Sequence, residues 1–329
     1  MKKRNTCYLM MRAVALCFLV IISNGVSAQS KSTGDSTTVV DSATVTKTDS
    51  TSSEDSSVSA PINEKKSFVK NTFEGDYLID NQTVMVPVKG SFVFAMQHRF
   101  GIASHGFKDM FGLFASATIR LGFAYVPVKN LEVGFGASND RMQVDWDVKY
   151  ALIKQTKDGS MPVSVTYFGN AVMDTRKQDA TTLFSSLSDR FSFFNQVIIA
   201  RKFSDKFSFQ VSASLSHFNN LQGYLDTSGK VQPLMKNDHF AISFSGRYKF
   251  TPQTSIIANY DQPLTQHPFN NPHPNISLGL EMRTSGHDFE VFIANYSHIL
   301  PQNNALFNQN DFTHGQFLIG FNITRLWNF

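Results

Sequence analysis

The sequence has only two cysteines among its 329 residues, and both lie within the first seventeen positions. In the same stretch, four basic residues precede an apolar run over residues 13–22, and small or short side chains follow at residues 26–28. This pattern predicts a secretory signal peptide over residues 1–28, because the run is too short to span a bilayer. The mature chain would then lack cysteine, which excludes disulfides, thiolate metal sites and cysteine nucleophiles.

An excess of charge is missing too. The whole chain has 30 basic and 26 acidic residues, and the four basic residues near the N-terminus belong to the predicted signal peptide. The mature chain would therefore carry 26 residues of each sign. Such a balance gives no electrostatic basis for binding nucleic acid, which we exclude as a partner.

Enzyme signatures are absent as well. The sequence contains no GxSxG, no P-loop, no GxGxxG after a strand and no HExxH. The nearest candidate for a serine–histidine pair is Ser216 and His217, but neighbours in a strand point to opposite faces and cannot act together. We therefore predict that the protein is not an enzyme and that it has no cofactor.

Residues 29–60 are of low complexity, with Ser or Thr at 17 of 32 positions and no aromatic residue. Such a segment buries too little apolar surface to offset its ordering entropy, so we expect a disordered periplasmic linker over residues 29–67. Ser36, Ser42 and Ser50 each follow an aspartate and precede a small residue, which resembles the O-glycosylation motif of Bacteroidota. An unmodified linker is the alternative.

The C-terminal stretch, residues 313–329, alternates between an apolar, aromatic face and a small or polar face, and it ends on Phe329. That is a long strand of period two, and its terminal aromatic residue resembles the C-terminal assembly signal of bacterial outer-membrane barrels. The same alternation predicts further strands, which make twelve with the last one: residues 92–100, 116–125, 131–138, 144–152, 162–171, 190–202, 207–218, 239–250, 254–261, 275–283, 288–296 and 313–329.

The connections between these strands alternate in length, with short turns on one side and mostly long loops on the other. Strand length, even strand number and loop asymmetry together predict an all-β, closed up-and-down antiparallel transmembrane β-barrel over residues 90–329, with short periplasmic turns and long extracellular loops. A soluble β-sandwich is the alternative fold. Residues 68–89 alternate only weakly and contain Pro87, and they are interpreted as a plug or a periplasmic segment before the first strand.

The motifs Thr-Phe-Glu-Gly at residues 72–75, His-Arg-Phe-Gly at residues 98–101 and Thr-Ile-Arg-Leu-Gly at residues 118–122 resemble a Bacteroidota family of outer-membrane β-barrels without an assigned function. The resemblance covers residues 68–329. It implies a barrel in the outer membrane of a Gram-negative bacterium of the Bacteroidota, and it implies no reaction.

Charged residues fall on the inward register of the first four strands, with both signs on neighbouring strands: Arg99, Arg120, Glu132, Asp145, Asp147 and Lys149. They are expected to form an ion-pair ladder that fixes the barrel or shapes the field of a pore.

Most histidines fall at the upper strand ends or in the long loops. Pairs on these loops are candidates for binding a ligand or a divalent metal: His217, His239, His267, His273, His298 and His314.

The first functional hypothesis is a narrow porin-like channel for small solutes, since twelve strands lie between the filled eight-stranded barrel and the open porin. The second is a closed structural or binding barrel whose histidine-containing loops hold a ligand, metal or partner. A lipid-modifying outer-membrane enzyme is the third. Expected partners are outer-membrane lipid, small solutes and the barrel-assembly machinery, which would bind the C-terminal strand.

Overall fold

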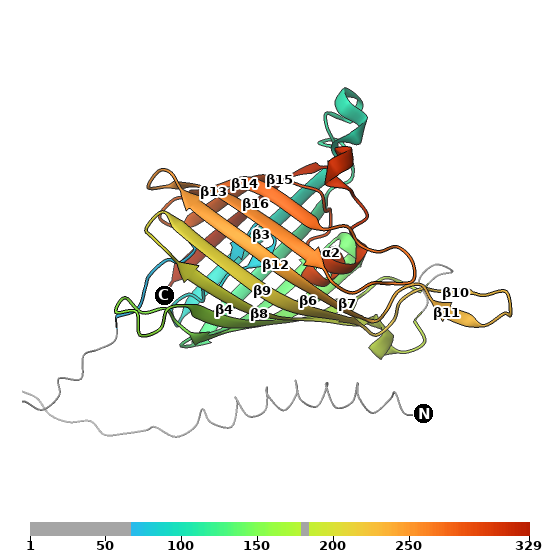
Figure 1. The fold of residues 1–329 in the computed structure, drawn as a ribbon, viewed down its shortest axis with the longest axis horizontal. Helices are drawn as coiled ribbons and strands as arrows, with labels where there is room; N and C mark the ends of the chain where they lie inside the picture. Colours follow the sequence, from blue (N-terminus) through green and yellow to red (C-terminus); the bar gives the residue numbers. More distant parts are fainter. Residues whose placement is uncertain (1–66, 179–183) are drawn as a thin grey trace, which may run out of the picture. The chain divides into compact units, whose positions relative to one another are not determined.

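The computed structural model describes residues 67–178 and 184–329. Within them, twelve antiparallel strands form one closed barrel, in which each strand pairs with the next and β16 pairs with β3 (Figure 1). The barrel strands are β3 Ser91–Ile102, β4 Thr118–Val128, β5 Leu131–Ser138, β6 Gln143–Ile153, β7 Ser164–Asp174, β8 Phe191–Lys202, β9 Phe207–Phe218, β12 Asp238–Lys249, β13 Thr254–Pro263, β14 Asn275–Arg283, β15 His287–Ala294 and β16 Leu318–Asn328. The predicted closed barrel of twelve strands is confirmed.

The two faces of each strand have opposite chemistry, as strand β9 illustrates. The buried side chains of its first ten residues point into the barrel and are Ser208, Gln210, Ser212, Ser214 and Ser216, whereas the apolar side chains that alternate with them point outward. Large apolar side chains also remain exposed on the outside of the other strands. A barrel that is polar inside and apolar outside presents its apolar band to lipid and satisfies its backbone by pairing around the ring.

Connections of different length gather at the two ends of the barrel. One end, which we call the short-turn end, holds residues 129–130, 154–163, 203–206, 250–253 and 284–286, together with the start of β3 and the end of β16. The other, the long-loop end, holds residues 103–117, 139–142, 175–190, 219–237, 264–274 and 295–317. Only residues 139–142 are short there, because β5 and β6 are joined by the brief 3₁₀ turn η2, Asp140–Met142.

The long loops contain the remaining elements: η1 Ala103–Asp109, η3 Leu187–Arg190, the hairpin β10 Gly223–Leu225 and β11 Val231–Pro233, α2 Pro301–Phe307, and η4 Phe312–His314. No helix in the described part of the chain is long and apolar enough to cross a membrane.

The last strand is shorter than the alternation suggested. It was predicted over residues 313–329, but β16 begins at Leu318. Residues Phe312–His314 form the 3₁₀ turn η4, and Gly315 ends it with a φ of 72° in the left-handed region. A glycine in this conformation redirects the chain, so pairing with β15 starts only after it.

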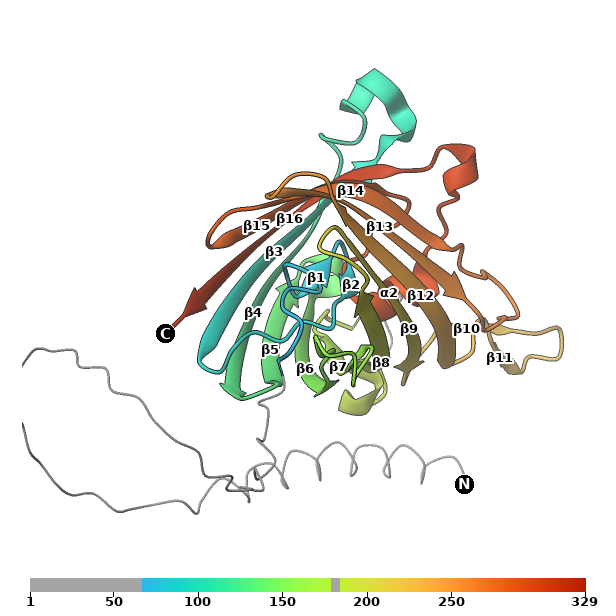
Figure 2. The ribbon, with the colours of Figure 1, turned by 60° about the vertical axis from the view of Figure 1, so that its left-hand side comes forward.

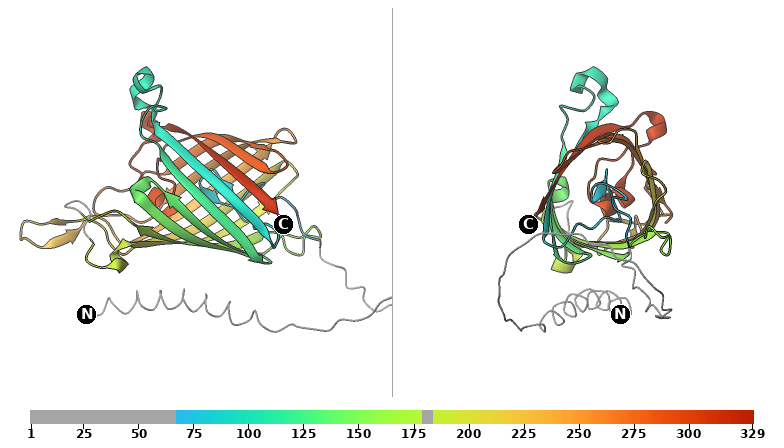
Figure 3. Two further views of the ribbon diagram at one scale, coloured as in Figure 1. Left: turned by 180° about the vertical axis from the view of Figure 1, so that it is seen from behind. Right: turned by 90° about the vertical axis from the view of Figure 1, so that its left-hand side faces the viewer.

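Two segments lie inside the ring of strands. A view along the barrel shows the small hairpin of β1 (Tyr77–Leu78) and β2 (Asn81–Gln82), and beside it α2, within the circle of barrel strands (Figure 3, right). Figure 2 shows the same hairpin among β4, β5 and the strands opposite. The core of the molecule is therefore the contact between these segments and the inner wall.

Candidate functional site

The inner wall of the barrel is mostly polar, and many of its side chains are small. Serine is the main inward residue of β9 and recurs on β8 and β12–β14. The buried polar residues of this sector include Ser192, Gln196, Ser208, Gln210, Ser212, Ser214, Ser216, Ser243, Ser245, Ser255, Asn259 and Ser277. Small hydroxyls leave space at the centre of a twelve-stranded ring. That space is where the inner segments lie.

A charged cluster occupies the wall formed by β4, β5 and β6. Arg120 donates to Asp145 through Nε at 2.9 Å and Nη2 at 2.6 Å, and Nη2 lies 3.5 Å from Asp147. On the strand between them, a Cβ at Gly136 would lie 2.5 Å from Arg120 Nη2 and 2.6 Å from Asp145. The glycine therefore lets the ion pair lie flat across β5, and the structure brings these three predicted charges together.

The other three predicted charges have different partners. Lys149 is fully buried and donates from Nζ to the backbone oxygen of Asp76, at 3.0 Å, in the inner segment. Glu132 lies opposite Lys149 on the neighbouring strand. Arg99 stands apart from this cluster and donates to Asn322 on β16, at 2.8 Å.

Residues 72–86, which we call the lumen segment, enter the barrel and turn back inside it. The tip of the β1–β2 hairpin is Ile79, which has a φ of 61°, an uncommon conformation for a β-branched residue. Two neighbouring residues of the wall hold this tip: the Ile79 N–H donates to the Glu290 carboxylate at 3.1 Å, and the Ile79 carbonyl accepts from Asn322 Nδ2 at 2.5 Å. Strain of this kind persists only where surrounding contacts fix it.

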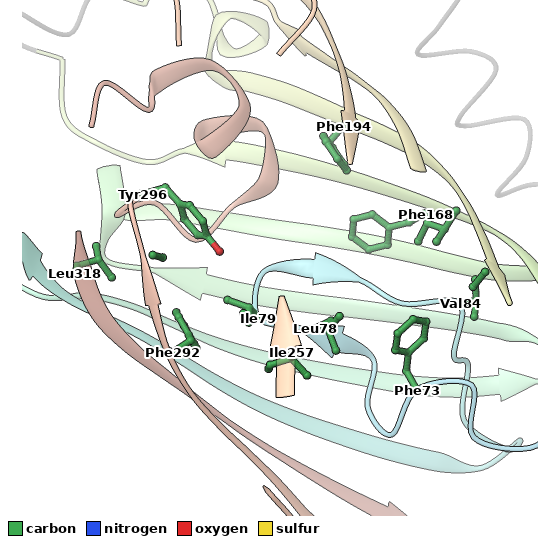
Figure 4. Close-up of a cluster of buried hydrophobic side chains, with 13 residues drawn as sticks. Phe73, Leu78, Ile79, Val84, Phe168, Phe194, Ile257, Phe292, Tyr296 and Leu318 are labelled. Carbon is green, nitrogen blue, oxygen red and sulfur yellow. The ribbon is translucent and has the colours of Figure 1, made fainter. Parts of the chain in front are cut away.

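Apolar side chains of the lumen segment pack on apolar islands in the polar wall (Figure 4). Leu78 and Ile79, both fully buried, belong to one cluster with Ile257 and Phe292 from the wall. Further members are Phe73, Val84, Phe168, Phe194, Ile198, Tyr296 and Leu318. The sequence analysis did not predict this packing of the lumen segment on the wall. It could have been indicated by the apolar residues that stand at inward positions of strands whose other inward residues are polar.

A carboxylate of the lumen segment is held by three cations at the short-turn end. Glu74 accepts from Arg247 Nη2 at 3.0 Å and from Lys249 Nζ at 3.0 Å, and it pairs with Arg283 Nη1. Burial raises the pKa of Glu74, but the hydrogen bond from Lys249 and the charges of all three cations outweigh it and lower that pKa below its usual range. None of these four residues was singled out from the sequence, because their pairing joins distant parts of the chain.

Amide side chains close the long-loop end. Helix α2 inserts three consecutive amide side chains, all buried. Gln302 donates to Asn170 at 3.0 Å, and Asn303 donates to Gln143 at 2.7 Å. Asn303 also donates to the Asp140 carboxylate at 3.2 Å, which contacts His298. Asn304 reaches the Asp80 carboxylate of the lumen segment instead.

Asp80 connects the lumen segment with the residues that close the long-loop end. Its carboxylate accepts from the Tyr296 hydroxyl at 2.5 Å and lies 3.5 Å from Asn304 Nδ2, both in the connection before β16. On the wall side it accepts from Asn259 at 3.3 Å. Burial raises the pKa of Asp80, although the hydrogen bond from Tyr296 and the charge of Arg99 oppose that rise.

Two small cavities lie beside the lumen segment. One cavity, beside Tyr77 and Arg120, has a volume of about 10 Å³, and another, beside Glu74 and Arg283, has about 50 Å³. A cavity needs roughly 10–15 Å³ to hold one water molecule. Each of these two cavities therefore has room for a few waters at most.

The candidate histidines lie at the long-loop end, with separate partners. His239 and His267 contact each other, with Nδ1 and Nε2 2.9 Å apart and their rings stacked. His217, His298 and His314 each contact a carboxylate, of Asp238, Asp140 and Asp311 respectively, and His273 donates its backbone N–H to Asn308. Among the described residues, no three His, Cys, Asp or Glu side chains gather closely enough to hold a metal ion.

The remaining candidates are at the chain ends. Phe329 follows β16 and its side chain is exposed. Ser36, Ser42 and Ser50, together with the predicted signal peptide and linker, lie outside the described residues.

Comparison with known proteins places the chain among membrane barrels. The sequence profile of a family described as membrane bound beta barrel domain (DUF5777) matches residues 73–327. No protein of curated function matches the sequence.

Several solved structures are similar in fold. The NanC porin has a TM-score of 0.44 at 9% identity, covering 72% of this chain and 99% of its own. An outer membrane channel of Pseudomonas putida F1 has a TM-score of 0.42 at 11% identity, covering 74% and 97%. The KdgM porin has a TM-score of 0.38 at 9% identity, covering 73% and 99%.

Proposed function

The chain belongs to the membrane bound beta barrel domain family, and from that premise we propose that it is an outer-membrane channel for small solutes whose lumen the segment 72–86 gates. In the conformation described above the channel is closed. Withdrawal of the lumen segment opens it.

One observation carries this proposal: both ends of the lumen segment leave the barrel at the same end. Phe68 pairs with Thr156 in the connection between β6 and β7, and the Gly90 N–H donates to Val126 near the end of β4. Both contacts lie at the short-turn end. The segment is thus a loop that can move in or out without threading the chain through the barrel, and none of the twelve strands has to break.

The chemistry of the wall supports the same function. A barrel with a purely structural role can fill its interior with the side chains of its own strands, as eight-stranded barrels do. Here the wall carries many serines and asparagines, and the lumen segment and α2 occupy the space that these small side chains leave. Withdrawal of the segment would leave a polar passage suited to water and small polar solutes.

The surroundings of the barrel follow from this function. We place the short-turn end in the periplasm of a Bacteroidota cell, with residues 1–28 removed as a signal peptide and residues 29–67 as a periplasmic linker. O-glycosylation at Ser36, Ser42 and Ser50 would keep that linker soluble. The C-terminal strand, ending on Phe329, would be bound by the barrel-assembly machinery, and the apolar outer face would be solvated by outer-membrane lipid.

A cysteine pair that locks the lumen segment to the wall tests the gate. The side chains of Asn81 and Ser245 are in contact, with Nδ2 and Oγ 3.2 Å apart, so Asn81→Cys with Ser245→Cys places two thiols on facing positions of the lumen segment and the wall, in a chain whose Cys7 and Cys17 are replaced by serine. In planar bilayers, we expect discrete openings from the reduced protein and their loss after oxidation. The Asn81→Cys single variant is the control, and oxidation should leave its openings unchanged.

Two results would overturn the proposal. Steady conduction through the oxidised pair would mean that solutes do not pass the lumen segment. No conduction from the reduced pair, and none from a Glu74→Lys variant, would establish a permanently sealed barrel.

The sealed barrel is the second candidate, and one observation favours it. The stacked His239 and His267 lie buried at the long-loop end, and Nε2 of His239 has no hydrogen-bond partner among the described residues. A loop ligand that accepts from or donates to this nitrogen would give a closed barrel a binding function.

A further inference from the structure

The contact between Glu74 and its three cations has the form of an occupied anion site. Arg247 and Lys249 are two residues apart on β12 and so point to the same face, and Arg283 comes from the end of β14. All three contact one carboxylate, whose side chain is only 6% exposed. Guanidinium and ammonium groups that converge on a single carboxylate form the arrangement by which proteins bind carboxylates and phosphates.

The acidic residues of the wall near this site do not substitute for Glu74 as the ligand of the three cations. Glu281 accepts from Arg247 Nε at 2.5 Å, whereas Glu74 accepts from Nη2, and Glu281 remains on the wall because it belongs to β14. Asp288 lies next to Gly75, where a Cβ would be 2.7 Å from its carboxylate. Glu74 therefore supplies a negative charge that no other ion pair among the described residues provides to this site's Lys249 and Arg283. Its removal leaves these cations without that charge at a partly buried site, and such an imbalance is costly.

A cavity reaches this site from the short-turn end. The cavity of about 50 Å³ is lined by Glu74 and Arg283, and also by Thr284 to Gly286 in the turn between β14 and β15. It adjoins the Glu74 carboxylate on one side and the exposed turn on the other. A small ion can therefore approach Arg283 before the lumen segment has moved.

We infer that Arg247, Lys249 and Arg283 form a binding site for small oxyanions, such as a phosphate or the carboxylate of a solute, which Glu74 occupies as an internal ligand. This inference rests on the proposed channel in one respect: a free anion that replaces Glu74 stabilises the state in which the lumen segment has left. Because the anion binds that state only, it shifts the population toward open channels in proportion to its concentration over its dissociation constant. The site also favours anionic solutes in the open lumen.

Binding can be measured without conduction. The Glu74→Ala variant removes the internal ligand and leaves space for an anion beside the cavity. In detergent-solubilised protein at constant ionic strength, isothermal titration calorimetry with inorganic phosphate, and separately with acetate, should show binding to Glu74→Ala at least about tenfold tighter than to the unchanged protein. Asp205→Ala is the control, since Asp205 lies exposed in the turn between β8 and β9 and its removal should not change the affinity.

Removal of two of the cations tests whether they are needed for phosphate binding. Lys249→Gln and Arg283→Gln, added together to Glu74→Ala, should abolish phosphate binding. These two side chains are 27% and 34% exposed, so the barrel should tolerate their loss, and the shift between boiled and unboiled samples on gels verifies folding. Arg247 is left unchanged because its removal would leave Glu281 unpaired. Equal phosphate affinity in Glu74→Ala and the unchanged protein, or affinity that survives the loss of both cations, would overturn the inference.

Conductance then separates this inference from the proposed function. In planar bilayers, phosphate added on the side of the short turns should raise the open probability of the unchanged protein, relative to chloride at equal ionic strength. The Glu74→Ala variant should open without phosphate. Tight, cation-dependent binding without any conductance in either protein would leave the anion site standing and refute the channel. Conductance in both proteins without binding would refute the anion site alone.

Discussion

The two closures of the lumen differ in the kind of contact that holds them. At the short-turn end, ionised groups hold Glu74, within reach of a cavity beside an exposed turn. At the long-loop end, Gln302 and Asn303 of α2 are themselves neutral and donate to amide groups, and Asn303 donates also to the Asp140 carboxylate, so no cation of α2 takes part. Ions in solution can compete for an ion pair, and salt screens it, whereas neutral hydrogen bonds respond to neither. The comparison indicates that the short-turn end is the one that moves.

The largest expected effect comes from reversing the charge of Glu74. Glu74→Lys places a fourth cation among Arg247, Lys249 and Arg283, and breaking a buried pair typically costs about 3–5 kcal/mol. Because Lys249 and Arg283 are partly exposed, we expect the lower end of that range. Open probability in planar bilayers should rise by roughly a hundredfold. Asp205→Lys makes the same charge change outside the lumen and should leave the closed state intact; if both variants opened equally, overall charge and not the gate would be responsible.

A smaller effect is expected where the two closures meet. Tyr296→Phe removes the hydroxyl that donates to Asp80 and leaves a buried carboxylate with one partner fewer, at a cost of about 1–3 kcal/mol. The temperature at which the folded band is lost on gels should fall, and brief openings should become more frequent. Tyr248→Phe, on the outer face of β12, is the matched control and should behave like the unchanged protein. Identical behaviour of the two variants would mean that Asp80 does not couple the closures.

The α2 closure should be affected less, and in a way that salt does not alter. Gln302→Ala with Asn304→Ala removes two uncharged amide donors, one to Asn170 and one at 3.5 Å to the Asp80 carboxylate, in hydrogen bonds worth about 1 kcal/mol each. Solute flux through the barrel should rise only when the lumen segment is also weakened by Glu74→Lys. Gln309→Ala, in the same connection but exposed, should change nothing. A large flux from the double variant alone, or a strong salt dependence, would assign the gate to α2 and reverse the comparison.

The smallest expected effect is that of acid. Asp80 has a raised pKa, so its ionised form disfavours the closed state, and the closed state gains stability as pH falls from that raised pKa toward the ordinary value of 3.8. Glu74 has a lowered pKa, so its contribution is lost only as pH falls below its ordinary value of 4.5. As pH is lowered toward 4.5, open probability should therefore fall slightly, and Asp80→Asn should reduce the change. Opening on acidification above pH 4.5 would show that another group controls the gate.

Much of the barrel could be predicted from the sequence. The alternation of Ser208, Gln210 and Ser212 with apolar neighbours indicated a wall with one polar face, and the same period gave all twelve strands to within a few residues. The inward positions of Arg120, Asp145 and Asp147 followed from the same register. Period-two patterning involves successive residues of one strand, so it can be recognised without knowing which strand pairs with it. The 3₁₀ turn η4, where the pattern was extended too far, lacks that signal.

The contents of the lumen depended on the tertiary structure. Glu74 is 173 residues from Arg247 and 209 from Arg283, and Asp80 is 216 from Tyr296, so no local pattern connects them. Only the closure of β16 onto β3 brings these strands around a common space, and only the serine-lined wall makes that space large enough for residues 72–86. The sequence by itself determined which face of each strand meets lipid, because that is a property of neighbouring residues. Which residues fill the interior was decided by the ring as a whole, because its diameter and register set what fits inside.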